Sequence, residues 1–447
     1  MSTASPRPPG PAGLPFIGVA HHFARDPLGF LTSTARTYGD VANFRLGGLD
    51  VYLVTHPDQV REVLIAQRSS FTMTALRAKI NAVVGEGLFT STGELHDRQR
   101  RLMLPVLRKS RIEAYAGQMA LLCRRMSGDW SAGAELDMAD AMMHLTMLIA
   151  AQALFEHDIG DETQKVSANI DVVLDFFTRL SSPFLKLYLT LPFPAGLRFK
   201  RAVRELDAVI YRMIDKRRRA GVAGNDLLSL LMQARDDQTH AQMTEKQLRD
   251  EVLTLLIAGH ETTANVLAWT FYLLALDPEA EARLHAEAVS VLDGREAFEV
   301  ADLDRLVFTR MAMQEGLRLY PPGWFVGREA LRDVRLGDYV VPKGAVVMLS
   351  QYVTQRDPRY YDEPDRFKPQ RWEGGLLERL PRGAYFPFSA GDRHCIGEGF
   401  AWQEGLLILA TLVARWRFEL APGTRVQPKP SVTLRPDGPI KMVVRSR

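Results

Sequence analysis

A single cysteine near the C-terminus lies in a loop that would hold its thiol rigidly at the start of a helix. Cys395 stands between Gly391 and Gly397, in a ten-residue stretch that begins at Phe388. Glycines allow turn conformations that are closed to other residues. A helical-looking segment, 400–413, follows the loop, and helix N-termini and loop amides stabilise a thiolate. A thiolate is the proximal ligand that haem iron needs for O–O cleavage, whereas the structural alternative is a buried cysteine that packs as a small apolar side chain.

Two donor side chains near residue 100 have the spacing of neighbours on a helix. His96 and Arg100 are four residues apart, so a helix would place them on one face. Together they could bind paired carboxylates, such as the two propionates of haem. The alternative is an ordinary solvated helix face.

The pattern of apolar residues predicts one very long helix. Thr244-x-x-Gln247 has the form of a capping box at its start, and Asp277-Pro278 should end it just after Leu276. About 32 residues at about 1.5 Å each give a length of roughly 48 Å, enough to cross a domain.

The centre of this helix carries residues that reduce helix stability. Ala258 and Gly259 precede a histidine, Glu261 and Thr262. A glycine there costs about 1 kcal/mol relative to alanine, and buried polar groups are costly unless paired. An acid beside a hydroxyl is suited to deliver protons. The structural alternative is that Thr262 hydrogen-bonds back to the preceding turn.

The rest of the chain reads as helices with a few strands. An extended Pro/Gly leader occupies 1–15. Alternation of apolar and polar residues predicts a β-hairpin over 41–46 and 50–55. The other predicted helices and strands cover 27–38, 59–67, 137–155, 201–217, 226–235 and 307–319 (helices) and 323–326, 346–349, 417–420 and 431–444 (strands).

Taken together, these motifs resemble those of the haem-thiolate monooxygenases, the cytochromes P450. The cysteine loop matches F-x-x-G-x-R-x-C-x-G, and 258–262 matches the oxygen-binding pattern A/G-G-x-D/E-T. The resemblance covers essentially the whole chain. It implies a mostly α fold with a small β region, in which a long central helix lies over haem and the cysteine loop lies on the proximal side. It also implies a single domain, 1–447, with no fused reductase and no membrane anchor.

The resemblance also implies roles for individual residues. Cys395 would ligate the iron of haem b, with Phe388 packed beside the sulfur and the amides of Ile396 and Gly397 bonded to it. Gly259, after Ala258, would let the backbone approach O₂. Glu261 and Thr262 would deliver protons. The residues expected to hold the propionates are His96, Arg100, Arg328 and Arg393.

A separate Glu-Arg motif is predicted to lock the fold beside the cysteine loop. Glu315 and Arg318 match the family's E-x-x-R, and a P-P turn follows them as the family requires. Glu329 and Arg332 have the same spacing but lack this context. Arg366, in a P-x-R-F segment, is expected to complete a buried triad.

The substrate is expected to be a hydrophobic small molecule: a fatty acid, terpenoid, polyketide or aromatic. The segments that the resemblance places around it are rich in apolar residues, and they cover 72–90, 182–193, 324–326 and 432–435.

Composition limits the partners and the cellular location that we expect. The net charge of +3 is too small to indicate a nucleic-acid partner, and two cysteines fit a reducing cytoplasm better than a disulfide framework. The N-terminus has no apolar region typical of a signal peptide. We expect a monomer that is not membrane-bound. A separate ferredoxin or flavodoxin would supply electrons, attracted by the basic cluster Arg98, Arg101, Arg108, Lys109 and Arg111.

Two other functions remain open from the sequence. One is a peroxide-driven peroxygenase or isomerase on the same fold, although such enzymes often lack the acid–alcohol pair that stands here at Glu261-Thr262. The other is a non-catalytic haem protein that binds a ligand or gas.

Overall fold

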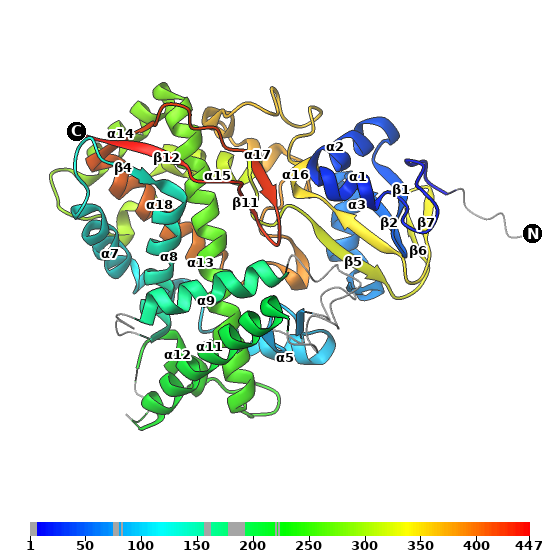
Figure 1. Cartoon of the computed structure of the whole chain (residues 1–447), viewed down its shortest axis with the longest axis horizontal. Coiled ribbons are helices and arrows are strands. Elements are labelled where there is room, and N and C mark those ends of the chain that lie inside the picture. The colour runs from blue at the N-terminus through cyan, green and yellow to red at the C-terminus, as the bar shows by residue number, and fades with distance from the viewer. Residues whose placement is uncertain are drawn as a thin grey trace, which may run out of the picture. The chain divides into compact units, whose positions relative to one another are not determined.

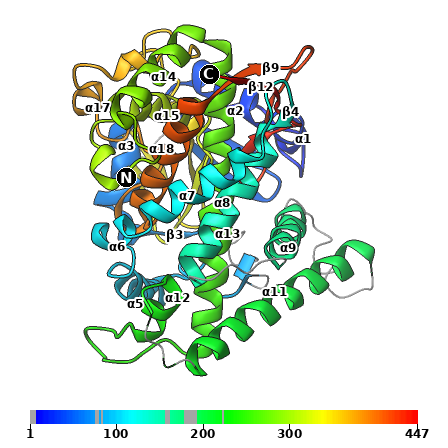
Figure 2. The same cartoon turned by 90° about the vertical axis from the view of Figure 1, so that its left-hand side faces the viewer.

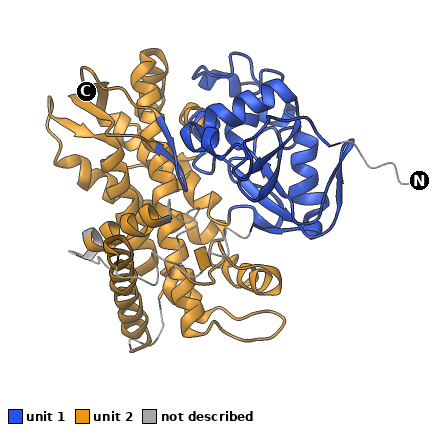
Figure 3. Cartoon of the chain, turned by 45° about the vertical axis from the view of Figure 1, so that its right-hand side comes forward, with its two compact units in different colours: residues 1–75, 314–395, 428–435 blue, residues 76–313, 396–427, 436–447 orange. Residues whose placement is uncertain are grey.

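The computed structural model describes residues 7–74, 80–81, 84–155, 162–177, 193–219, 221 and 224–447. The chain divides into two compact units (Figure 3). Unit 1 comprises residues 1–75, 314–395 and 428–435, and unit 2 comprises 76–313, 396–427 and 436–447. Two segments predicted to line the pocket fall partly outside the described residues, namely 75–79 and 82–83 within 72–90, and 182–192 within 182–193.

Unit 1 is built on a five-stranded sheet with the order β1-β2-β8-β5-β3. Its strands are β1 Val41–Leu46, β2 Leu49–Val54, β8 Val346–Leu349, β5 Val326–Ala330 and β3 Phe71–Met73. The predicted hairpin is confirmed, with Val41 paired to Val54. The strand predicted at 323–326 begins three residues later, at Val326.

Short helices and small strand pairs complete unit 1. Its helices are α1 Ala20–Arg25, α2 Pro27–Tyr38, α3 Pro57–Arg61 and α16 Gln351–Thr354, with α17 Leu376–Arg379; the π-helix η1 Glu62–Ala66; and the 3-10 turns η2 Arg68–Ser70, η4 Pro369–Trp372 and η5 Gly391–Arg393. The helix predicted over 59–67 is therefore α3 continued by a π-turn. The strand pairs are β6 Val334–Leu336 with β7 Tyr339–Val341, and β10 Pro428–Pro430 with β11 Leu434–Pro436.

Unit 2 is mostly helical. Its helices are α5 Gly93–Met103, α6 Lys109–Glu113, α7 Ala116–Gly128, α8 Met138–Phe155, α9 Glu162–Phe177, α11 Pro194–Arg219, α12 Leu227–Gln233, α13 Glu245–Leu276, α14 Pro278–Leu292, η3 Val300–Asp302 and α18 Glu398–Arg415. α15 Val307–Leu319 runs from unit 2 into unit 1. A three-stranded sheet, β4 Glu135–Asp137, β12 Lys441–Ser446 and β9 Trp416–Leu420, completes the unit.

The long helix is confirmed as α13, which runs beside α8 through unit 2 (Figures 1 and 2). Both halves of the predicted capping box form, since the Thr244 hydroxyl accepts the Gln247 N–H and the Gln247 side chain accepts the Thr244 N–H. The helix has 32 residues and ends before Asp277.

One described helix, α8, has the length and apolar composition that a membrane span needs. Within the structure 61% of that stretch is buried, as expected for a core helix that packs along α13.

Candidate functional site

The cysteine loop in unit 1 is fixed by its own backbone. The Cys395 N–H donates to the Phe388 carbonyl at 2.9 Å, and the thiol is exposed. Gly391 has φ +68°, and a Cβ there would lie 2.1 Å from the Leu64 carbonyl oxygen, so only glycine fits. The loop is also tied to η2, four residues after Leu64, by an ion pair between Arg68 and Asp392. An exposed thiol on a braced loop is the arrangement that a metal ligand needs.

Cys395 stands just before the N-terminus of α18, whose N-cap is Gly397. Ile396 and Gly397 donate no backbone hydrogen bond within the described part of the chain, so both amides remain available to a sulfur ligand. The predicted position of the thiol at a helix start is therefore confirmed.

Two arginines of unit 1 form an unusual cationic pair. Arg328, on β5, is only 7% exposed, and it makes no ion pair with any described residue. Burial, together with the charge of Arg393, lowers the pKa of Arg328 to about 10. A buried guanidinium with a second positive charge nearby is costly unless an anion neutralises it. The structure thus brings together two of the four residues predicted to hold propionates.

The other two predicted propionate ligands lie on α5, in unit 2. His96 is 3% exposed, with its Nδ1 3.2 Å from Asp97 Oδ1, and Arg100 follows one turn later, half-buried. The helix is confirmed, so the two side chains share a face as predicted.

The predicted basic cluster near α5 is partly neutralised. Arg101 pairs with the buried Asp236 at 3.0 Å, and Lys109 lies 3.8 Å from Glu113. Arg111 donates to a neutral amide oxygen instead. Fewer free positive charges therefore remain there than the sequence indicated.

The centre of α13 presents a bare face in a helix that is otherwise mostly buried. Ala258 is exposed, Gly259 and Thr262 are half-buried, and nothing lies within 4 Å of the point where a Cβ on Gly259 would sit. Glu261 is 3% exposed. Backbone, hydroxyl and carboxyl are therefore adjacent on one stretch of helix, and a small ligand has room beside the glycine.

The structural alternative for Thr262 is confirmed. Its hydroxyl donates to the Ala258 carbonyl at 2.7 Å. A hydroxyl has one proton, so in this state Thr262 can only accept a hydrogen bond from a ligand. Donation would require the hydroxyl to leave the helix carbonyl.

His260, within the same motif, was not assigned a role from sequence. It is fully buried, its Nδ1 lies 2.8 Å from the Leu256 carbonyl, and burial lowers its pKa to about 4. Its own carbonyl accepts the Thr146 hydroxyl of α8 at 3.0 Å. The backbone carbonyl of His260 therefore ties the centre of α13 to α8, while its neutral imidazole bonds within α13. No local sequence signal distinguishes such an anchor from a catalytic histidine.

The Glu-Arg lock forms, but the predicted third member is wrong. Glu315 and Arg318 pair at 2.8 Å and are fully buried. Arg371, in η4, supplies the second cation at 2.8 Å. Arg366 instead stays exposed and pairs with Glu363 at 2.9 Å. The motif P-x-R-aromatic occurs twice within ten residues. In the second, Trp372 also donates its indole N–H to Glu315 at 3.0 Å, whereas Phe367 of the first has no such donor.

Trp324, a candidate substrate contact, belongs to the core of unit 1. It is 4% exposed and its indole N–H donates to the Ser431 carbonyl at 3.0 Å. Its neighbours Phe325 and Val326 are half-buried. A bonded indole is held in place for structure, so Phe325 and Val326 are the better placed of the three for contact with a ligand.

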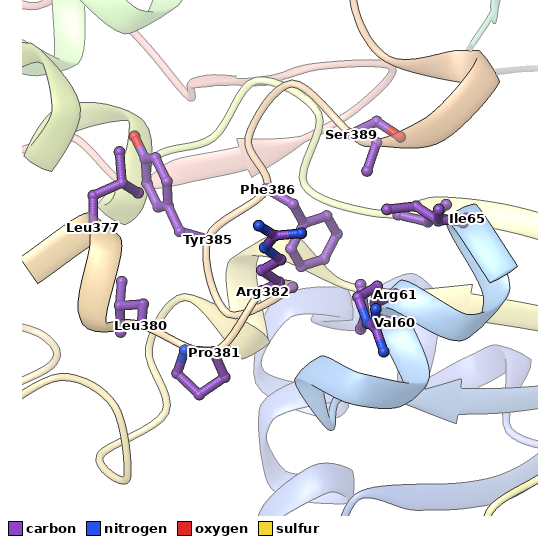
Figure 4. Close-up of a pocket in the computed structure, with 13 residues that line it drawn as sticks. Val60, Arg61, Ile65, Leu377, Leu380, Pro381, Arg382, Tyr385, Phe386 and Ser389 are labelled. Carbon is purple, nitrogen blue, oxygen red and sulfur yellow. The ribbon is translucent and has the colours of Figure 1, made fainter.

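Unit 1 also has a hollow of about 230 Å³, lined by residues of the segments 60–65 and 377–390 (Figure 4). Apolar side chains of η1 and of the segment before the loop line it, with Arg61 and Arg382 among them. None of the predicted site residues lines this hollow, so it is distinct from the predicted substrate site.

The donor set fits haem. An exposed, braced thiol suits an axial ligand, and the buried cation Arg328 beside Arg393 suits a carboxylate such as a propionate.

Comparison with known proteins gives the same result over the whole chain. The family model for cytochrome P450 matches residues 8–444. Cyclooctatin synthase from Streptomyces melanosporofaciens is 39% identical, covering 98% of this chain and 95% of the relative. Cyclooctat-9-en-7-ol 5-monooxygenase from the same organism is 37% identical, covering 95% and 93%. The crystal structure of the cytochrome P450DA heme domain aligns with a TM-score of 0.90 at 26% identity, covering 99% and 98%.

The mostly helical architecture with small sheets is shared with solved structures of the matched family. The chain belongs to the cytochrome P450 family and is a haem-dependent monooxygenase that uses O₂ and electrons from a redox partner.

Proposed function

We propose that the enzyme inserts one oxygen atom into a cyclic terpenoid that carries few polar groups. One relative is named for oxidation of cyclooctat-9-en-7-ol, an alkene with a single hydroxyl. The observation that carries the proposal is the composition around the bare face of α13. Leu255, Ile257 and Ala258 are incompletely buried there, whereas Glu261 is 3% exposed. An apolar surface favours a substrate that is recognised by its hydrocarbon skeleton.

Residue roles follow from chemistry that haem supplies when it is bound, namely the activation of O₂. Cys395 would hold the iron as a thiolate, and the amides of Ile396 and Gly397 would donate to its sulfur. Phe388 would pack beside the sulfur. Hydrogen bonds to a thiolate ligand tune the potential of the metal centre. The propionates would be held by His96, Arg100, Arg328 and Arg393.

Proton delivery is assigned to Glu261 and Thr262. The carboxyl of Glu261 is adjacent in sequence to the hydroxyl of Thr262. Because this hydroxyl donates its proton in a hydrogen bond to the Ala258 carbonyl, its lone pairs remain free to accept one. We propose that Thr262 accepts a hydrogen bond from ordered water and that Glu261 exchanges protons with it. Ala258 and Gly259 leave space for O₂.

Electrons are proposed to come from a separate ferredoxin or flavodoxin. The enzyme is proposed to act as a monomeric single domain in the cytoplasm. Arg98, Arg108 and Arg111 carry no ion pair with a described residue, which supports an acidic partner near α5 and α6. Reduction of the haem by purified ferredoxin and flavodoxin at low and high salt would test this assignment.

The substrate proposal is tested by spectral titration of the ferric enzyme. Cyclic terpene alcohols are compared with fatty acids of the same carbon number. We expect a saturable Soret shift with a terpenoid at least about tenfold tighter than with the matched acid, one decade corresponding to 1.4 kcal/mol. Tighter binding of the fatty acid would refute the proposed substrate class.

The proton-delivery proposal has an internal control on the same helix. Thr270 donates to the Val266 carbonyl at 2.7 Å and is fully buried, so it makes the same back-bond as Thr262 without the bare face. We expect Thr262→Ala to divert reducing equivalents to hydrogen peroxide, which lowers the amount of product formed per NADPH consumed. Thr270→Ala should leave this ratio unchanged. Equal ratios in both variants would contradict a role for Thr262.

A further inference from the structure

Three consecutive ionisable side chains on α13 hold the backbone of one neighbouring segment. The Arg249 guanidinium donates to the Val84 carbonyl at 3.0 Å. Asp250 accepts the Glu86 N–H at 2.9 Å, and Glu251 accepts the Leu88 N–H at 2.9 Å. We call Arg249, Asp250 and Glu251 the clasp. Because it binds alternate main-chain groups of the segment 84–88, the clasp fixes the path of that backbone whatever its side chains are.

Arg249 also connects the clasp to another helix. Its Nε donates to Asp207 Oδ1 of α11 at 2.7 Å, and its Nη1 donates to Asp250 Oδ1 at 2.9 Å. The side chain is 8% exposed. One buried guanidinium therefore joins α11, α13 and the segment 84–88, so loss of Arg249 would loosen all three together.

The segment lies so close to α13 that two of its positions must be glycine. A Cβ on Gly85 would lie 2.1 Å from Asp250 Oδ1, and Gly85 has φ +84°. A Cβ on Gly87 would lie 2.1 Å from Thr254 Oγ1. The two glycines in the sequence thus permit the close approach.

The two glycines contact the side of α13 that carries the bare face of the site. Thr254, Ala258 and Thr262 follow one another at intervals of four, so they line one side of the helix. Gly87 touches Thr254, about one turn from Ala258 and two from Thr262. Leu88 is 8% exposed and packs in the core cluster of unit 2. The segment therefore closes one end of the bare face.

We infer that Arg249, Asp250 and Glu251 are positioning residues for the monooxygenase reaction, because the clasp holds the segment 84–88 over this end and sets how fast ligands reach and leave. The inference rests on the proposed location of the site along α13, and it is independent of the substrate class.

Glu251 allows the clasp to be tested with a matched pair of variants. Burial raises its pKa to about 8, so the carboxyl is mostly neutral at pH 7. Its second oxygen, Oε1, is buried and has no partner among the described residues. Glu251→Gln keeps an oxygen that accepts the Leu88 N–H, whereas Glu251→Leu fills similar volume and removes that acceptor.

Hydrogen exchange reports directly on the clasp. In the haem-loaded enzyme, we expect the Leu88 amide to exchange at least about fivefold faster in Glu251→Leu than in the wild type, the factor that corresponds to one lost hydrogen bond. Glu251→Gln should restore the wild-type rate. Unchanged exchange at Leu88 in Glu251→Leu would overturn the inference.

Ligand kinetics test the consequence. The probe is 4-phenylimidazole, which binds haem through its own nitrogen and shifts the Soret band, so a failed terpenoid titration would not affect the result. By stopped flow we expect Glu251→Leu and Arg249→Leu to raise both association and dissociation rates about fivefold, with a smaller change in Kd.

The control variant is Arg217→Leu, which breaks the pair of an arginine with the buried Asp226 elsewhere in unit 2. Its ligand rates should match the wild type. Equal acceleration in Arg217→Leu would mean that general destabilisation opens the site, and this would overturn the role of the clasp.

Discussion

Replacement of Arg371 by methionine should destabilise the protein far more than the same replacement at Arg366. Both arginines belong to P-x-R-aromatic segments, and each pairs with one glutamate. Arg371 is 5% exposed in its side chain, against 70% for Arg366. Besides Glu315, it donates to the carbonyls of Asp362, at 2.6 Å, and Glu363, at 3.1 Å.

The expected cost follows from these contacts. Arg371→Met removes one of the two cations that neutralise a fully buried carboxylate. It also leaves main-chain carbonyls without a donor. Removal of one partner from a buried ion pair costs about 3–5 kcal/mol. Arg366→Met removes a solvent-exposed pair, which water replaces, so its effect should lie within experimental error.

The assay is urea unfolding of the haem-loaded protein, followed by tryptophan fluorescence and by the Soret band. The two midpoints should fall together in Arg371→Met and stay at the wild-type value in Arg366→Met. If Arg371→Met cost no more than Arg366→Met, the reasoning that places Arg371 in the buried triad would be wrong.

Three further predictions concern single groups. The pKa of Glu251 is about 8 in the native state, against an ordinary 4.5. Between these values the native state keeps a proton that the unfolded chain releases. The contribution of Glu251 to the free energy of unfolding should therefore fall by about 1.4 kcal/mol per pH unit between about pH 4.5 and 8. Unfolding of Glu251→Gln should show a flatter pH profile over this window, and an identical profile would argue against the raised pKa. Burial also raises the pKa of the Cys123 thiol, and the thiolate is the nucleophile, so mass spectrometry should find Cys123 alkylated only after unfolding. Because Arg328 and Arg393 repel each other, Arg328→Leu should stabilise the haem-free protein yet speed haem transfer to apomyoglobin; slower or unchanged haem loss would exclude a propionate contact.

Local signals in the sequence predicted the elements that local chemistry controls. The ends of α13 were predicted to the residue because a capping box and an Asp-Pro pair act within one helical turn. The bounds of α15, Val307–Leu319, were also predicted as observed. The cysteine loop could be placed because glycine positions and the following helix are encoded within ten residues.

Long-range contacts decided what the sequence alone left open or gave wrongly. The partner of Glu315 is 56 residues away, so spacing could not choose between Arg366 and Arg371. The charge of the basic cluster fell because Asp236 pairs with Arg101 across 135 residues. The clasp was invisible for the same reason, since Glu251 meets Leu88 across 163 residues.

The family follows from motifs along the whole chain, and the sequence by itself also determined three local features: the position of the cysteine loop, the adjacency of Glu261 and Thr262, and the limits of the long helix. Each of these depends on residues within a few turns of one another, where the backbone geometry is fixed by local propensity. Only the tertiary structure decided which charges are neutralised, which arginine completes the buried triad and what holds the segment 84–88. Those outcomes depend on burial and on partners far apart in the chain, because the free energy of a charged group is set by its surroundings rather than by its place in a motif.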